Sequence, residues 1–132
     1  MIAVDTSAIV AMAFDEAEAE PFTRLIVERS AIVGTPTLVE ASAVLSRLRS
    51  DIAEAFLARL VATPAIRTVD FTFEMAAAAR RAFQLYGKGR GHPARLNFGD
   101  CLSYAVAKVH GLPLLFKGDD FARTDVASAW RP

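Results

Sequence analysis

The sequence is poor in the residues that build disulfides and soft-metal centres. Its 132 residues include one cysteine, Cys101, and two histidines. A single cysteine excludes an internal disulfide and a cysteine-based zinc site, and it suits a reducing compartment. Cys101 lies near the start of a predicted helix, so we interpret it as a small buried thiol and not as a nucleophile.

Long apolar runs and a basic leader are also missing. No uninterrupted apolar run approaches the roughly 20 residues of a membrane span. The apolar start Met1–Phe14 has no basic segment before it and contains Asp5. We therefore expect a soluble, cytoplasmic protein. Because 53% of the residues are hydrophobic, the chain has material for a real core, and we expect residues 1–132 to form one domain.

The chain has no net charge. Its 15 basic residues balance 15 acidic ones, so bulk charge does not indicate a nucleic-acid binder and any basic footprint must be local. The two signs are unevenly spread: residues 1–60 carry nine acids and five bases, whereas residues 76–132 carry four acids and nine bases. The acids concentrate at Asp15–Glu20, which we interpret as the solvated start of a helix.

Short apolar runs alternate with segments of helical spacing. The runs that predict strands are Ile2–Val4, Ala31–Val33, Ile66–Val69 and Leu112–Phe116, with a weaker one at Val126–Ala129. Helical spacing follows most of these runs, at 8–14, after Pro21, from 35, from 51 to before Pro64, at 72–86 and at 97–110. The alternation predicts an α/β domain with a mainly parallel sheet.

Acidic residues recur where strands end and helices begin. Asp100 lies three residues after Asn97, where a capping-box acid belongs, and its plain role would be to complement the helix dipole. Four other acids fall at positions from which they could meet it: Asp5 after the first strand, Glu40 early in a helix, and Asp119 and Asp120 after the fourth strand. Parallel sheets bind ligands outside the carboxyl ends of their strands, so these acids are expected at one edge.

Gathered carboxylates repel one another unless their pKa values rise or a cation holds them. Oxygen ligands without thiolates or clustered imidazoles suit Mg²⁺ or Mn²⁺ better than zinc. Such an ion can position a water as nucleophile while it neutralises charge on a phosphate. Acids beside the basic loop Lys88–Arg95 therefore indicate metal-dependent phosphodiester hydrolysis. Each acid also has a simpler alternative: a helix cap for Asp5, an Asx-turn for Asp119 and Asp120, and a surface position for Glu40.

Several segments match a family pattern over essentially the whole chain. They are Val4–Ala8, Glu40 in the helix after Thr35 and Pro36, Tyr86–Gly89, Leu96–Cys101 and Leu114–Phe121. On these residues the sequence resembles the PIN-domain ribonucleases, and specifically the VapC toxins of bacterial toxin–antitoxin pairs. The resemblance implies a three-layer fold with a five-stranded, mostly parallel sheet. It also implies a Mg²⁺- or Mn²⁺-dependent endoribonuclease acting on structured RNA such as tRNA or rRNA.

The resemblance extends to roles and partners. Asp5, Glu40 and Asp100 match the first three acids of the family's site. Asp120 best matches the fourth, while Asp119 would assist through water or only shape the turn. In the implied mechanism Asp5 and Asp100 hold the metal, Asp120 completes its ligands, and Glu40 orients the attacking water or binds a second ion. The implied partner is a VapB-type antitoxin that lays a C-terminal segment into the active-site groove. The implied assembly is a toxin homodimer that the antitoxin joins into a larger complex.

Polar neighbours provide candidates for auxiliary roles. Thr6 or Ser7 could hydrogen-bond a water at the metal, or simply cap the first helix. The basic loop contributes four candidates for RNA binding: Lys88, Arg90, His92 and Arg95. The three bases would contact phosphates, and the histidine would touch a phosphate or stack on a base. The alternative for this loop is a solvated connection.

Two other functions fit parts of the pattern. Phosphatases and phosphoacceptor domains also begin with an aspartate at a strand end. A haloacid-dehalogenase-type loop, however, requires a second acid two residues later, and this position is Ser7 here. A PIN-like scaffold that binds RNA or antitoxin without cleavage is the second alternative. All the expected acids are present, so nothing in the chain indicates lost activity.

Overall fold

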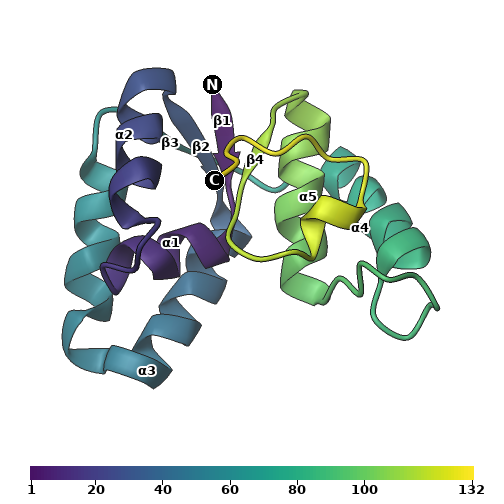
Figure 1. Cartoon of the computed structure of the whole chain (residues 1–132), viewed down its shortest axis with the longest axis horizontal. Helices are drawn as coiled ribbons and strands as arrows, with labels where there is room; N and C mark the ends of the chain where they lie inside the picture. The colour runs from purple at the N-terminus through teal and green to yellow at the C-terminus, as the bar shows by residue number, and fades with distance from the viewer.

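A parallel four-stranded sheet lies at the centre of the computed structural model, which describes all residues from 1 to 132 (Figure 1). The strands are β1 (Ile2–Val4), β2 (Ala31–Gly34), β3 (Ile66–Val69) and β4 (Leu114–Leu115). Their order across the sheet is β3-β2-β1-β4, and each neighbouring pair is parallel. The parallel arrangement confirms the α/β class predicted from the alternation of strands and helices.

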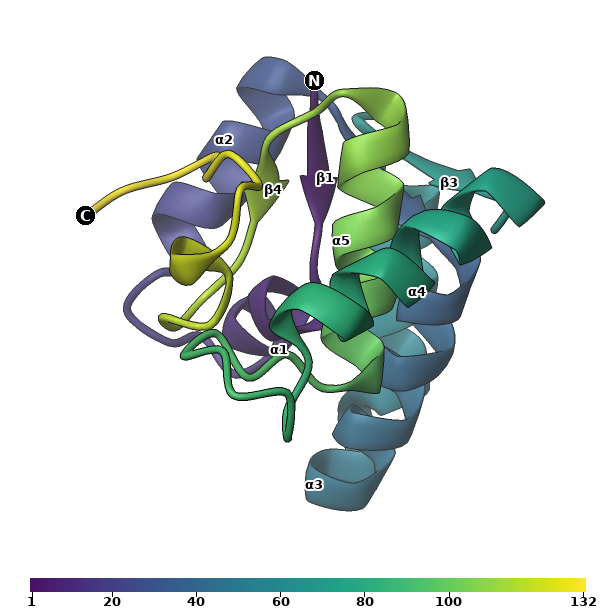
Figure 2. The same ribbon diagram turned by 90° about the vertical axis from the view of Figure 1, so that its right-hand side faces the viewer.

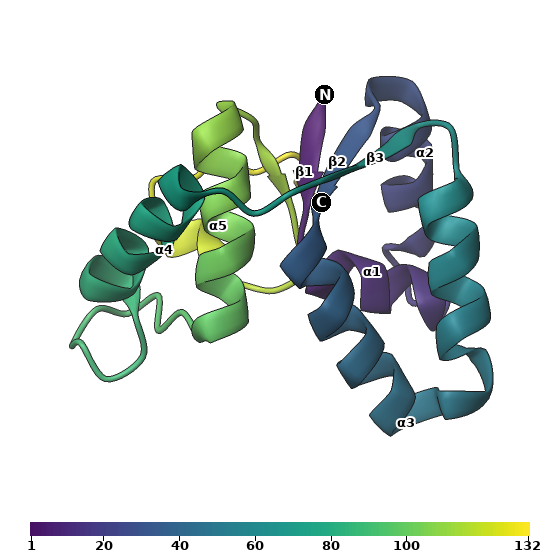
Figure 3. The same cartoon turned by 180° about the vertical axis from the view of Figure 1, so that it is seen from behind.

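Helices cover both faces of the sheet and make three layers. They are α1 (Thr6–Ala13), α2 (Ala19–Arg29), α3 (Thr35–Ala62), α4 (Phe73–Tyr86) and α5 (Phe98–His110), with a short 3₁₀ helix, η1 (Phe121–Arg123), after β4. The helices α1, α2 and α3 lie on one side, and α5 lies between the sheet and α4 on the other (Figures 1 and 3). None of these helices combines the length and the apolarity that crossing a membrane requires.

The strands contribute side chains to apolar clusters on both faces. Ala3 and Ile32 pack in the cluster under α4 and α5, whereas Ile2 and Val33 pack in the cluster under α1, α2 and α3. Successive side chains of a strand point to opposite faces, so a sheet covered on both sides needs apolar residues at every position. This is why the two central strands, β1 and β2, are continuous apolar runs, whereas the edge strand β3 contains Arg67 and Thr68, which are exposed.

The predicted fifth strand does not form, and the sheet has four strands. Near the C-terminus only Ser128 pairs with Leu114, in an isolated parallel bridge. Two hydrogen bonds of 2.8 Å make it, from Leu114 N to Ala127 O and from Ala129 N to Leu114 O. The strand β4 is only two residues long, and Pro113 before it has no N–H to extend a ladder. Strand β4 is therefore too short for the C-terminal segment to form a further strand beside it.

Residues 35–62, which share the label α3, form two helical halves that meet at a kink, and this confirms the two helices that the spacing predicts. Arg49 leaves the helical region, with φ −149° and ψ 74°. Its Nε and Nη2 atoms donate to the Asp51 carboxylate at 3.0 and 2.8 Å, on the far side of the kink. The first half of α3 starts directly after β2 and carries Glu40, and the second half runs back toward β3 (Figure 3).

Candidate active site

Three of the predicted acids meet at the carboxyl edge of the sheet. Asp5 directly follows β1, Glu40 lies in the second turn of α3 after β2, and Asp100 lies in the first turn of α5. All three line one open pocket together with Thr6 and Ser7. Figure 2 shows that the carboxyl end of β1 points to the end of the molecule where α1 and the first turn of α5 lie. The topology thus gathers acids that are far apart in the sequence.

Asp5 is buried, and half of its carboxylate is unpaired. It is only 3% exposed, and it caps α1 because its Oδ2 accepts from Ser7 N at 2.9 Å and from the Ser7 hydroxyl at 2.6 Å. The other oxygen, Oδ1, is buried without a hydrogen-bond partner. A buried polar atom without a partner is costly and calls for an explanation. The helix cap therefore explains one of the two oxygens and leaves the other free for a ligand.

Glu40 is held by the first turn of α1. The Thr6 hydroxyl donates to Glu40 Oε1, a bond between residues 34 positions apart. The position of α3 depends on Gly34 at the end of β2, where an added Cβ would lie only 2.8 Å from Cγ2 of Val106 in α5. Glycine allows the strand end to approach α5 closely, so α3 begins beside the helix that carries Asp100.

Asp100 caps α5 as the spacing predicts. Asp100 N donates to Asn97 Oδ1 at 2.8 Å, and Asn97 N donates to Asp100 Oδ2 at 3.0 Å, which completes a capping box. Burial foremost, and then the negative charges of Asp5, Asp120 and Glu40, raise the pKa of Asp100 to about 7 against the lowering effect of its hydrogen bond from Asn97. Asp100 therefore lies close enough to the other three acids to sense their charge.

The loop after β4 distinguishes Asp120 from Asp119. Asp120 is the exposed residue that precedes η1, and its charge raises the pKa of Asp100. Asp119 lines a different pocket, beside Trp130. Neither residue lines the pocket of Asp5, Glu40 and Asp100 itself. The placement favours Asp120 as the fourth acid and leaves Asp119 as a turn residue.

The donor set suits a hard divalent cation, although the acids do not converge on one point as they lie. No group of three histidine, cysteine or acidic side chains comes close enough to hold a metal ion. Asp5 accepts a hydrogen bond from Ser7, and Glu40 accepts one from Thr6. These hydroxyl groups stabilise the two carboxylates, whose negative charges repel each other. The fit to Mg²⁺ or Mn²⁺ rests on the chemistry of the site: its donors are oxygen atoms, Asp5 Oδ1 is unpaired, and the pocket is open.

Two charged residues of the pocket escape prediction from the sequence, Glu16 and Lys117. Lys117 Nζ forms ion pairs with Glu16 and, at 3.0 Å, with Glu18, while Lys117 N donates to Ser7 Oγ at 3.0 Å. The interpretation of Asp15–Glu20 as a solvated helix start holds for the start of α2, where Glu20 is exposed. Glu16 and Glu18 in addition tie the α1–α2 loop to the loop after β4. Lys117 could have been predicted, because it lies in the segment Leu114–Phe121 that matches the family pattern. No neighbouring residue or motif indicates a role for Glu16.

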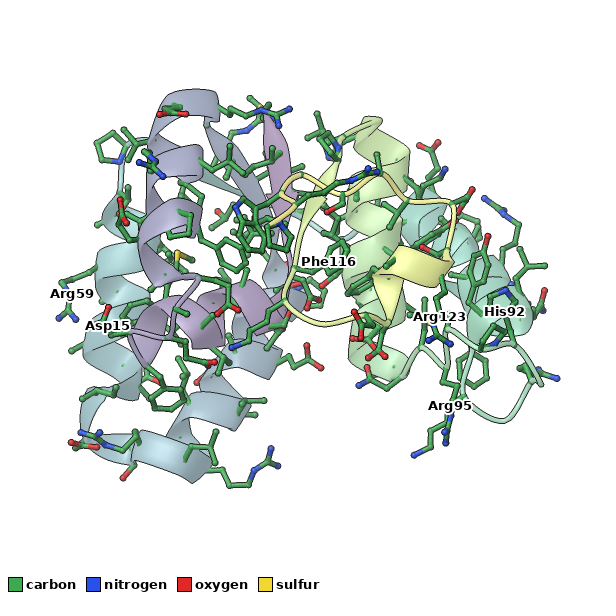
Figure 4. The ribbon with its side chains drawn as sticks, viewed as in Figure 1. Asp15, Arg59, His92, Arg95, Phe116 and Arg123 are labelled. Carbon is green, nitrogen blue, oxygen red and sulfur yellow. The ribbon has the colours of Figure 1, made fainter.

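The predicted RNA-binding residues occupy the loop between α4 and α5, outside the acidic pocket. Of the four candidates, Lys88, Arg90 and Arg95 are exposed and His92 is half-buried. None of them lines the pocket. In Figure 4 the labelled His92 and Arg95 lie on one side of the molecule, with Asp15 and Arg59 on the opposite side. The loop thus presents a separate basic surface.

Two of these loop residues also make contacts within the protein. The Arg90 guanidinium lies over the Phe83 ring, 5.6 Å from its centroid. His92 Nδ1 accepts from Ala94 N at 3.0 Å, and its ring meets Tyr86 edge-on at 4.9 Å between centroids. These contacts give the loop a defined shape, so it is more than a solvated connection.

Cys101 follows Asp100 but has no nucleophilic character. Its side chain is buried, and burial followed by the charge of Asp100 raises the pKa of the thiol to about 11. The thiol therefore stays protonated near neutral pH, when only a thiolate would attack. This agrees with its interpretation as a small buried residue.

The fold and the acids at its carboxyl edge can be compared with known protein families. The family model described as "PIN domain" matches residues 2–127, and the chain belongs to the PIN-domain family. Within that family it is of the VapC type: Ribonuclease VapC30 of Mycobacterium tuberculosis is 40% identical over 130 residues, which cover 98% of each chain. The resemblance noted in the sequence is confirmed.

Solved structures share the fold. The crystal structure of VapC20 from Mycobacterium tuberculosis, described as a sarcin-ricin loop cleaving toxin, has a TM-score of 0.76 and 21% identity, and the match covers 100% of both chains. A chain of a toxin-antitoxin complex from Klebsiella pneumoniae has a TM-score of 0.69 and 15% identity, again over 100% of both chains. At these identities the likeness concerns the fold, and it confirms the three-layer PIN-like arrangement.

Proposed function

We propose that this VapC-type ribonuclease is the toxin of a type II toxin–antitoxin system, a Mg²⁺-dependent endoribonuclease that cleaves structured RNA such as tRNA or rRNA. Membership of the family supports the ribonuclease activity. The observation that carries the proposal is the pocket shared by Asp5, Glu40 and Asp100, in which Asp5 Oδ1 is buried and unpaired. Mn²⁺ is an equivalent ion for these oxygen donors.

The acids divide the work in the proposed reaction. Asp5 and Asp100 would hold the ion, and Asp120 would contribute from the loop after β4. A divalent ion bound there supplies positive charge to the scissile phosphate and makes a water a better nucleophile. Glu40, fixed by the Thr6 hydroxyl, orients the water in line with the phosphorus. The new bond joins this water oxygen to phosphorus as the water loses a proton, the bond to the 3′ oxygen breaks, and that oxygen takes up a proton from solvent. The products carry a 5′-phosphate and a 3′-hydroxyl.

Contacts behind the acids keep them in place. Ser7 bonds to Asp5 through both its N–H and its hydroxyl, and its Oγ also accepts from Lys117 N. Residues behind a metal ligand orient it and tune its affinity. In the proposed site Ser7 and Thr6 have this positioning role, for Asp5 and Glu40 respectively.

A VapB-type antitoxin is the proposed partner. The Klebsiella pneumoniae relative of this fold was solved as a toxin-antitoxin complex. Exposed apolar residues mark surfaces that partners cover, and on α2 and α3 of this chain they are Val27, Val39, Leu48 and Val61. We propose that the antitoxin lays a C-terminal segment into the groove beside the acids, and that toxin homodimers join through the antitoxin into a larger complex.

Cleavage of RNA tests the proposed function. The purified protein is expected to cut tRNA or rRNA transcripts with Mg²⁺ or Mn²⁺ and to leave them intact in EDTA, because the acids alone provide no positive charge to the phosphate. Gels give the rate, and sequencing of the cut ends is expected to show 5′-phosphates and 3′-hydroxyls. RNA that is bound but stays intact with either ion would support a binding scaffold instead. Transfer of phosphate from a small donor to Asp5 would support the phosphatase alternative.

Replacing Arg90 by Gln is expected to weaken RNA binding and to flatten its salt dependence. Each phosphate contact contributes about 0.7–0.9 to the slope of log affinity against log salt concentration, so losing one contact lowers the slope by roughly that amount. Binding titrations in EDTA at several salt concentrations measure the effect. Arg59→Gln, an exposed change on the opposite side (Figure 4), is the matched control and leaves the slope unchanged. An Arg90→Gln slope equal to that of the wild type would remove Arg90 from the RNA-binding surface.

A further inference from the structure

The carboxylate of Glu40 lies directly against the backbone of Gly99, in the first turn of α5. A Cβ built on Gly99 would lie 1.7 Å from Glu40 Oε2, 2.4 Å from Cδ and 2.6 Å from Oε1. Real Cβ atoms essentially never come within 3.0 Å of another heavy atom. Gly99 is also buried. No side chain of any size fits at this position while Glu40 stays where it is.

Backbone conformation does not explain this glycine. Gly99 lies within α5 and has no positive φ, so any L-residue could adopt its conformation. Glycine is also among the least favourable residues inside a helix, and alanine is the most favourable. Local structure therefore favours alanine at position 99, and the space occupied by the Glu40 carboxylate is the remaining reason for glycine.

The first turns of two helices, α1 and α5, form the seat of the Glu40 carboxylate. The first turn of α1 provides the Thr6 hydroxyl, which donates to Oε1. The first turn of α5 provides the bare backbone of Gly99, against which Oε2 rests. Helix N-termini carry a partial positive charge that favours an anion. The seat thus bonds Oε1 to Thr6 and leaves room for Oε2 beside Gly99, one residue along the chain from Asp100.

We propose that Gly99 is a positioning residue for Glu40: its missing side chain lets the carboxylate lie between α1 and α5, at the depth that the pocket requires. The functional part of this inference rests on the ribonuclease activity proposed above. An alanine at 99 displaces the carboxylate toward solvent and breaks its bond with Thr6. Misplacement of a catalytic group by about 1 Å can cost roughly 100-fold in rate.

A double-mutant cycle between positions 99 and 40 tests the inference. Gly99→Ala is expected to lower RNA cleavage at saturating Mg²⁺ by about 10- to 100-fold. In the Glu40→Asp background, where the shorter acid withdraws from position 99, the same change is expected to cost less than about 2-fold. Equal losses in the two backgrounds, or a fully active Gly99→Ala protein, would overturn the proposal.

A second measurement needs neither metal nor RNA. In EDTA, Gly99→Ala is expected to lower the melting temperature in the wild-type background, because the Glu40 carboxylate has to leave its place beside position 99. In the Glu40→Ala background it is expected to raise it, because the clash is gone and only the gain in helix propensity remains. A shift of the same sign in both backgrounds would contradict the inference. If Gly99→Ala does not fold, folding of the double variant supports the proposal and failure of both overturns it.

The two measurements separate this inference from the proposed function. A wild-type protein that fails to cut RNA would refute the nuclease, yet the melting temperatures would still show whether Gly99 makes room for Glu40. Conversely, if the protein cuts RNA but its rate and melting temperature do not change when residue 99 is replaced, only the role of Gly99 is refuted.

Discussion

Changing Asp5 or Asp100 to Asn is expected to lower RNA cleavage more than about 100-fold while the fold persists. Replacing residues that merely support metal ligands costs roughly 10- to 100-fold, and these two acids are the proposed ligands themselves. Their negative charge is what holds the cation, and an amide provides only a neutral oxygen. At Asp5 an amide N–H₂ would also occupy the place of the buried, unpaired Oδ1.

Asparagine is the informative substitution because it keeps both helix caps. An amide oxygen can still accept from Ser7 N at position 5 and from Asn97 N at position 100, where the carboxylates accept at 2.9 and 3.0 Å. Cleavage rates at saturating Mg²⁺ measure the loss, and circular dichroism with thermal melting verifies the fold. Asp15→Asn is a matched control, since Asp15 is exposed, does not line the pocket and has a φ of 50° that asparagine tolerates. A wild-type rate in either active-site variant would refute the assignment.

Mg²⁺ is expected to raise the stability of the wild-type protein substantially. A ligand that binds only the folded state at about 100 times its Kd adds about 2.7 kcal/mol, which corresponds to a rise in melting temperature of roughly 10 °C. The physical source is the repulsion among Asp5, Glu40, Asp100 and Asp120, which a divalent cation converts into attraction.

Melting curves in EDTA and in a Mg²⁺ series measure this stabilisation, with NaCl at matched ionic strength as the salt control. Asp100→Asn is expected to remove most of the Mg²⁺-dependent rise. The same variant without metal is expected to melt no lower than the wild type, because a half-buried carboxylate near three other acids is replaced by a neutral amide while the cap remains. An equal Mg²⁺-dependent rise in wild type and Asp100→Asn would place the cation elsewhere.

The fold was largely predictable because its central strands are buried on both faces. Such strands are continuous apolar runs, and β1 and β2 fall where those runs are. The edge strand β3 also lies where a strand was predicted, although Arg67 and Thr68 in it are exposed. The wrong detail is the fifth strand, which does not form. That outcome depends on a neighbour, because β4 is too short to pair along.

The acids were predictable as candidates to different degrees. Asp100 had a local signal, since a capping box involves only residues three positions apart, and its bonds with Asn97 are those expected. Asp5 was marked by the end of a strand. Glu40 had no strong local signal, and family likeness singled it out. The choice between Asp119 and Asp120 was open in the sequence, and the shared electrostatics with Asp100 now favour Asp120.

By itself the sequence determined the class of fold, the helix caps and the inventory of oxygen donors, because these depend on interactions between residues a few positions apart. Only the tertiary structure decided that Thr6 bonds to Glu40, that Lys117 pairs with Glu16, and that Gly99 leaves room for a carboxylate from another helix. The partners in the first two contacts are 34 and 101 positions apart. Contacts at such separations arise only when sheet order and helix packing bring distant segments together, and no local pattern encodes which segments meet.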